Sequence, residues 1–282
     1  MLNRLTVSAL LKAVILTTAV CIVLGVSLSA WDSWSRVQQT NGIAAIADAS
    51  ANVFKAMHNL RTDQSTTFRL LNAEPPVGSD IDKYLRGLRD AEMPAMASAL
   101  ALLPSIEFPQ RTTLVPELDR LFKLLTALQK EFWDAVDKPK ASRRPELSKQ
   151  YYDATAALLQ TLDKLSAALA AAVNHQDATI DQLLAIKQTA WLLRNTAGEG
   201  SLLISKGLAA GSVPAEVRLT YTKFVGGTEI AFRALELAPS GMQLPAALSA
   251  AIAATKAAYF DPEYLALRDR LLAALIAAAK PN

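Results

Sequence analysis

Two arginines, Arg61 and Arg194, are the residues whose type and placement suggest a chemistry in this chain of 282 residues. Each follows a leucine and flanks the apolar side of a segment with helical periodicity, and they lie 133 positions apart. A guanidinium group at the edge of a helical core must be paired, solvated or offered to an anionic ligand. The pattern therefore makes both arginines candidates for an anion site, and it leaves the other two alternatives open. The plainer alternative is an exposed or salt-bridged arginine at each place, with Asp63 or Glu199 as the nearby partner.

A short polar run at 174–177 interrupts an otherwise apolar helical pattern. Its members Asn174, His175 and Asp177 are candidates for a site or hinge at a junction between two modules. The alternative is a solvated joint or a short break, because helical bundles need polar residues where the core is discontinuous.

Signatures of enzymes and metal sites are absent from the sequence. It has two histidines and one cysteine, and His58 has no His, Cys or acidic residue at ligand spacing within its helix. Neither a nucleophile elbow nor a His–Glu zinc helix occurs. We therefore expect a protein that is not an enzyme and that has no metal and no cofactor. A net charge of +3, with acidic and basic residues interleaved, indicates no nucleic-acid partner.

The elements that would position these residues are helices, so the predicted fold class is all-α. The 51% hydrophobic fraction is largely Ala and Leu, and the 52 residues at 146–197 contain no Gly or Pro. Segments 99–105 and 234–240 share five of seven residues, which indicates an internal duplication. The prediction is two stacked four-helix-bundle modules, 37–173 and 174–282, that share one long central helix.

The N-terminal segment has the features of a membrane anchor. Residues 13–31 carry no charge and are long enough to span a bilayer, with Arg4 and Lys12 before them and Trp31 at the far end. This pattern predicts a cytoplasmic N-terminus at 1–12, a transmembrane helix at 13–31 in the inner (cytoplasmic) membrane, and a periplasmic remainder. The alternative is a cleaved signal peptide that ends near Ala30. Both alternatives send everything after residue 31 across the membrane.

The segment 188–203, QTAWLLRNTAGEGSLL, together with a shorter copy at 60–66, LRTDQST, resembles a first-helix motif of helical sensor regions. The resemblance is to the extracytoplasmic sensors of bacterial methyl-accepting chemotaxis receptors, of the bimodular and nitrate/nitrite-sensing types. It implies a homodimer and assigns anion binding, of nitrate or an organic anion, to Arg61 and Arg194. The second membrane helix, HAMP-type coupling domain and cytoplasmic hairpin of that family do not occur in these 282 residues. This leaves two alternatives, a piece of a receptor or a stand-alone relative.

The functional prediction is a membrane-anchored, ligand-sensing domain for chemotaxis-type signal transduction, which binds a small solute between helices and passes on a helix displacement. Two other classes stay open. One is a membrane-tethered scaffold that binds a protein and no solute. The other is a pore-forming or lipid-interacting helical protein.

Overall fold

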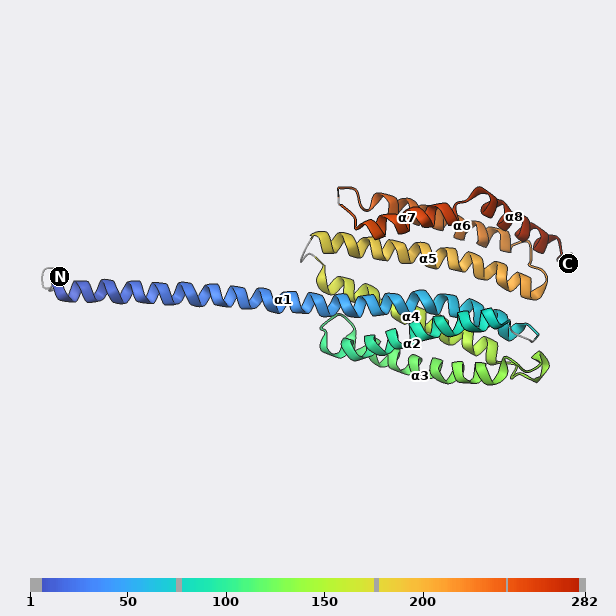
Figure 1. Ribbon diagram of the computed structural model, residues 1–282, viewed down its shortest axis with the longest axis horizontal. Helices are drawn as coiled ribbons and strands as arrows, with labels where there is room; N and C mark the ends of the chain where they lie inside the picture. Colours follow the sequence, from blue (N-terminus) through green and yellow to red (C-terminus); the bar gives the residue numbers. More distant parts are fainter. Residues whose placement is uncertain (1–6, 75–77, 175–177, 242, 279–282) are drawn as a thin grey trace. The chain divides into compact units, whose positions relative to one another are not determined.

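The computed structural model describes residues 7–74, 78–174, 178–241 and 243–278, and throughout these ranges the regular structure is helical (Figure 1). The predicted all-α class is therefore confirmed. The helices are α1 (Val7–Asn72), α2 (Ser79–Leu102), α3 (Arg111–Ala135), α4 (Leu147–Val173), α5 (Ala178–Ala210), α6 (Val217–Leu237), α7 (Ala246–Tyr259) and α8 (Pro262–Ala277), with short 3-10 turns η2 (Leu103–Ser105) and η3 (Lys140–Ser142).

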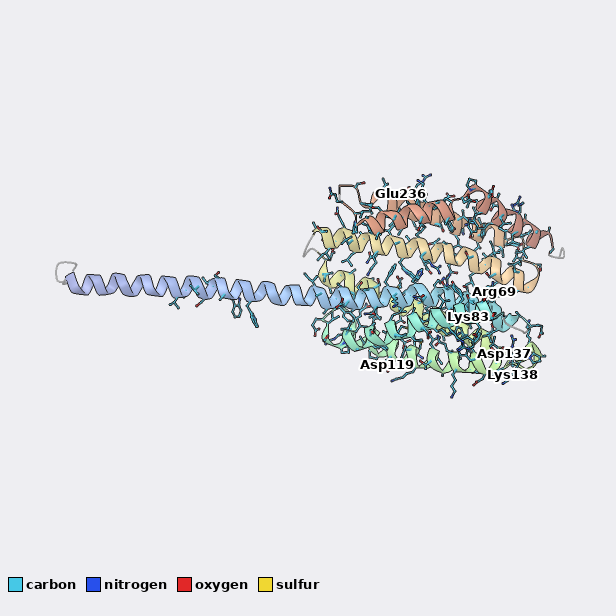
Figure 2. All side chains as sticks on the ribbon, in the orientation of Figure 1. Arg69, Lys83, Asp119, Asp137, Lys138 and Glu236 are labelled. Carbon is cyan, nitrogen blue, oxygen red and sulfur yellow. The ribbon has the colours of Figure 1, made fainter. Side chains whose placement is uncertain are left out.

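The chain divides into two units, Met1–Ala47 and Asp48–Asn282. In the first unit, large apolar side chains of α1 between residues 23 and 34 face outward, from Val23 at 63% exposed to Trp31 at 76% exposed. In the second unit, charged residues of both signs lie on the outside of the helices, among them Lys83, Asp119, Asp137, Lys138 and Glu236 (Figure 2). Some of them form exposed ion pairs, such as Lys123 with Asp119 at 2.6 Å.

Helices α1 to α4 of the second unit share a core. The apolar stripe that the sequence predicts on α4 is confirmed, because each of its members is fully buried: Tyr151, Thr155, Leu158, Leu162, Leu165 and Leu169. Facing residues from the other three helices, such as Leu60, Leu85 and Leu125, are equally buried. Over the described residues, α4 is also the helix that is long and apolar enough to qualify as a membrane span, with half of that stretch buried inside the protein.

The prediction of one long central helix is wrong. Helix α4 ends at Val173, Asn174 has an extended backbone (φ −60°, ψ 140°), and α5 begins at Ala178 as a separate helix. His175 and Asp177 lie outside the described residues. Good intrinsic propensity adds little free energy per residue, and most helical stability comes from tertiary packing of the apolar face. A continuous rod would have carried α5 away from α1, whereas the break lets α5 pack along it.

Helices α5 to α8 form two apolar clusters. The first joins Ile186 and Leu193 of α5 to Phe232 and Leu235 of α6, and the second centres on Ile204, Tyr221 and Leu272. Helix α8 has a capped start, since the Asp261 carboxylate accepts a hydrogen bond of 2.8 Å from the Tyr264 backbone N–H and Pro262 occupies the first turn.

Two consecutive glycines, Gly226 and Gly227, favour a break in a helix, yet α6 continues through both of them. A Cβ at Gly227 would lie 3.0 Å from Cγ2 of Thr196 on α5. The absence of a side chain at Gly227 therefore lets α5 and α6 pack closely, and α6 continues without a break.

Candidate functional site

The contact between α1 and α5 brings the two predicted arginines together. Lys187 Nζ donates to Ser50 Oγ at 2.6 Å, the rings of Trp191 and Phe54 meet edge-on at 6.3 Å, and Arg194 Nη2 donates to Thr62 Oγ1 at 2.7 Å. Successive contacts ascend both helices in the same direction, so α1 and α5 run parallel here. Residues that the duplication treats as equivalent therefore lie on two helices that touch.

Gly198 provides the space in which both guanidinium groups fit. A Cβ built on this glycine would lie 2.9 Å from Nη1 of Arg194 and 2.9 Å from Nε of Arg61. Arg194 lies one helical turn before Gly198, so the two share a face of α5. Any side chain at this position would push one arginine away from the other.

Arg61 is held in place by neighbours on two helices. It is 5% exposed, and its Nη2 lies 2.6 Å from the carboxylate of Glu199 on α5. Its Nη1 donates to Gln64 Oε1 at 2.6 Å, and Gln64 in turn donates to the Tyr152 carbonyl of α4. Arg61 therefore forms an ion pair, and of the two carboxylates that the sequence offers as partners it pairs with Glu199.

Arg194 has a different environment. Within the described part of the chain, no carboxylate lies within ion-pair distance of it, and Thr62 is the hydrogen-bond acceptor recorded for its guanidinium. Burial first, and then the positive charge of Arg61, lower the pKa of Arg194. Two cations and one carboxylate thus gather at one place, and a half-buried positive charge without a counter-charge favours the approach of an anion.

Two cavities adjoin this cluster. A polar one of about 220 Å³ lies between α1, α4 and α5, and Arg61 and Glu199 line it together with Gln64, Tyr152, Gln160, Asp163, Trp191 and Asn195. A larger one of about 420 Å³ lies between α1, α5, α6 and α7, and Arg194 and His58 line it among mostly apolar side chains. Each cavity therefore has one of the two arginines in its lining.

Comparison with protein-family models, curated proteins and solved structures gave no match. The candidate site thus stands on its geometry alone. Among the described residues no cluster of three or more His, Cys, Asp or Glu side chains is placed to hold a metal ion. Asn174, from the predicted junction, is exposed at the end of α4 and lines neither cavity.

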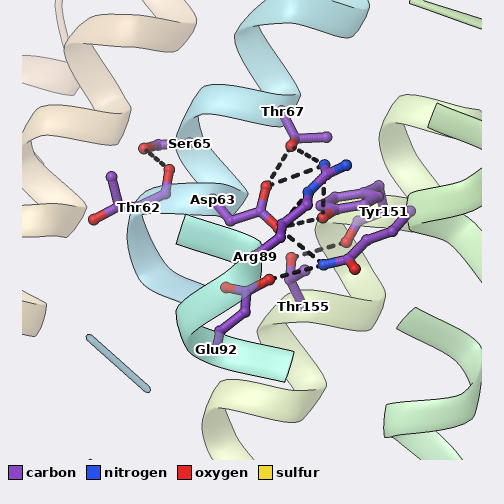
Figure 3. A network of polar contacts seen from close by, with 9 residues as sticks. Thr62, Asp63, Ser65, Thr67, Arg89, Glu92, Tyr151 and Thr155 are labelled. Carbon is purple, nitrogen blue, oxygen red and sulfur yellow. Dashed lines mark hydrogen bonds and ion pairs between the residues drawn. The ribbon is translucent and has the colours of Figure 1, made fainter. Parts of the chain in front are cut away.

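A buried polar network centred on Asp63 is the second polar feature of the unit, and the sequence did not predict it (Figure 3). Asp63 of α1 is fully buried and accepts hydrogen bonds from Arg89 of α2, Gln129 of α3 and Tyr151 of α4. All four helices therefore converge on one carboxylate. The signal was in the spacing, because Arg89 and Gln129 fall on the apolar faces of their helices, where a polar residue needs a buried partner.

Glu92 completes the network next to Asp63. It is fully buried and accepts a hydrogen bond of 2.8 Å from Gln129 Nε2, which also donates to Asp63. Burial first, and then the negative charge of Asp63, raise the pKa of Glu92 well above its ordinary value of 4.5, against the opposing charge of Arg89. The surroundings of Glu92 therefore favour the protonated form of its carboxyl group.

A rise in pH is expected to destabilise the protein through Glu92. The folded chain holds this proton more tightly than the unfolded chain, so the free energy of unfolding falls as pH rises above the ordinary Glu pKa of 4.5 and stops falling once the folded group has ionised. Glu92→Gln keeps the shape, has no proton to lose, and should flatten that slope. Urea unfolding across this pH range measures both chains, and parallel slopes would contradict the assignment.

Proposed function

We propose that the helical unit after residue 47 binds a small anion at the contact between α1 and α5, as the sensing part of a membrane-anchored signal transducer of chemoreceptor type. The observation that carries the proposal is the meeting of Arg61 and Arg194 beside Gly198, where Glu199 pairs with Arg61 and, in the described part of the chain, no carboxylate pairs with Arg194. A bound anion would supply the missing negative charge and accept charge-assisted hydrogen bonds from the free edges of the guanidinium groups.

The same geometry suggests how binding would be passed on. The anion would be shared by one arginine from each of two parallel helices, so its arrival would change the α1–α5 contact at Thr62, Arg194 and Glu199. Helix α1 is continuous from Val7 to Asn72. A small displacement of α1 at the site is therefore the movement that we propose for the signal.

The proposal includes the predicted membrane anchor at 13–31, in the cytoplasmic membrane, with the following residues in the periplasm. Its support is the outward-facing apolar surface of α1, where Leu28 is 70% and Trp31 is 76% exposed. Such a continuous apolar surface suits a lipid environment, and tryptophans suit its boundary with water. The four-helix grouping of α1–α4 and of α5–α8, as two duplicated and stacked four-helix-bundle modules, belongs to the same proposal.

A second candidate function, a scaffold that binds protein, is favoured by an apolar stripe on α6. Leu219, Ile230 and Leu237 are 63%, 71% and 70% exposed and lie on one side of that helix, since their spacings of 11 and 7 are close to whole turns. The predicted homodimer would use the same stripe. If the Leu237→Asp variant remains dimeric in light scattering, the stripe is not part of the interface between two copies.

Calorimetric titration of the full chain in lipid nanodiscs with nitrate and with short carboxylates tests the anion site. Arg194→Met and Arg61→Met should each weaken the binding of whichever anion binds by about tenfold or more, because each removes a charge-assisted contact. Arg144→Met is the matched control, since its guanidinium is exposed and pairs with Glu131 away from the site. If both single variants keep the affinity of the unmodified chain, the arginines are not the anion site.

A further inference from the structure

The size and the apolar lining of the cavity beside Arg194 indicate which kind of anion would fit there. Its volume of about 420 Å³ falls within the range of about 300–1,000 Å³ typical of small-molecule sites. The apolar side chains that line it come from four helices: Phe54 of α1, Ala190, Leu193 and Ala197 of α5, Leu235 of α6, and Leu248, Ala251 and Ile252 of α7. An inorganic anion has no apolar part, so these apolar side chains would have no ligand group to contact.

The polar groups of the cavity are few. Arg194 provides the positive charge in the lining of the cavity, and His58 lies at the exposed rim. Thr255 and Tyr259 supply hydroxyl groups. Burial first, and then the charge of Arg194, lower the pKa of His58 below its ordinary value of 6.5, which favours the neutral side chain. The lining thus presents one positive charge in an otherwise apolar space.

Helix α7 is the side from which a ligand would enter the cavity. Its residues are exposed or partly buried, and Leu248 and Ile252 pack against the α5–α6 cluster without being enclosed by it. A helix that buries so little can move aside at low cost, because local opening requires only the loss of those contacts. The wall of the cavity that α7 provides is therefore the one that would yield to an entering ligand.

We propose that this cavity binds a monocarboxylate with an apolar body, its carboxylate on Arg194 and its hydrocarbon chain among Leu193, Leu235, Leu248 and Ile252. The inference rests on the proposed function in one respect, the use of Arg194 as an anion-binding group. It goes further in naming the ligand class, a short aliphatic or aromatic acid, and in assigning the space between α5, α6 and α7 to the ligand's apolar part.

A chain-length series tests the inference with the full chain in nanodiscs. Titrations with nitrate, acetate, butanoate and hexanoate, each corrected by a blank titration into empty nanodiscs, should show affinity rising about fourfold for each methylene group added. Equal affinities along the series would overturn the apolar site while leaving the anion-binding function intact. Failure of every anion to bind would overturn both.

Two variants locate the ligand. Ala251→Trp fills the cavity from an exposed position of α7 and should weaken hexanoate binding by at least tenfold. Ala250→Trp is the matched control, because Ala250 is exposed on the same helix and does not line the cavity. Arg194→Met should abolish the preference for hexanoate over the uncharged alcohol of equal length. Unchanged hexanoate affinity in Ala251→Trp, with thermal unfolding like that of the control, would place the acid elsewhere and overturn the proposal.

Discussion

Replacing Asp63 with alanine is expected to lower the free energy of unfolding by about 3–5 kcal/mol, the loss typical when one partner of a buried ion pair is removed. Arg89 is 6% exposed, and Asp63 is its recorded ion-pair partner. The variant also takes a hydrogen-bond acceptor from Tyr151 and Gln129. Urea denaturation followed by far-UV circular dichroism measures the change.

Two further variants make the test specific. Asp153→Ala removes an exposed carboxylate that pairs with Lys149 on the surface of α4, and it should change stability little. The double variant Asp63→Leu/Arg89→Met replaces the buried charges with apolar groups and should recover much of the lost stability. If Asp63→Ala unfolds at the same urea concentration as Asp153→Ala, the network does not hold the four helices together.

Replacing Arg143 with alanine is expected to cost about 3 kcal/mol, because a charged group makes net contributions of about 1.5–3 kcal/mol through its hydrogen bonds. This side chain is 7% exposed and donates to five backbone carbonyls at the ends of α1 and α3. The acceptors are Leu70, Leu71, Ala73, Val136 and Lys138. Those carbonyls have no intrahelical partner at a helix end, so Arg143 satisfies them.

The neighbouring residue is the natural control for Arg143. Arg144 has the same chemistry and adjoins it in sequence, but its guanidinium is exposed and pairs with Glu131, so Arg144→Ala should change stability little. Arg143→Lys should recover only part of the loss, since an ammonium group has three donors and lacks the planar fork. Equal midpoints for Arg143→Ala and Arg144→Ala in thermal unfolding would show that the carbonyls do not depend on Arg143.

The sequence predicts part of the candidate site. The duplication pattern singled out Arg61 and Arg194, and Glu199 was named as a partner for one of them. Nothing in the linear pattern placed the two arginines against each other, made room for them at Gly198, or formed a cavity beside each. These features depend on the parallel packing of α1 and α5, a contact between residues more than a hundred positions apart.

The sequence by itself determined the all-α class, one buried helix face and one helix start, because the causes of these features are local. Spacing of apolar residues specified the buried stripe of α4, and Asp261 with Pro262 specified the start of α8. Where the chain turns back was decided by the tertiary structure. The residues at 146–197 favour one helix by propensity, yet α4 and α5 are separate, since burying two apolar faces against α1 outweighs the small gain from continuing a helix.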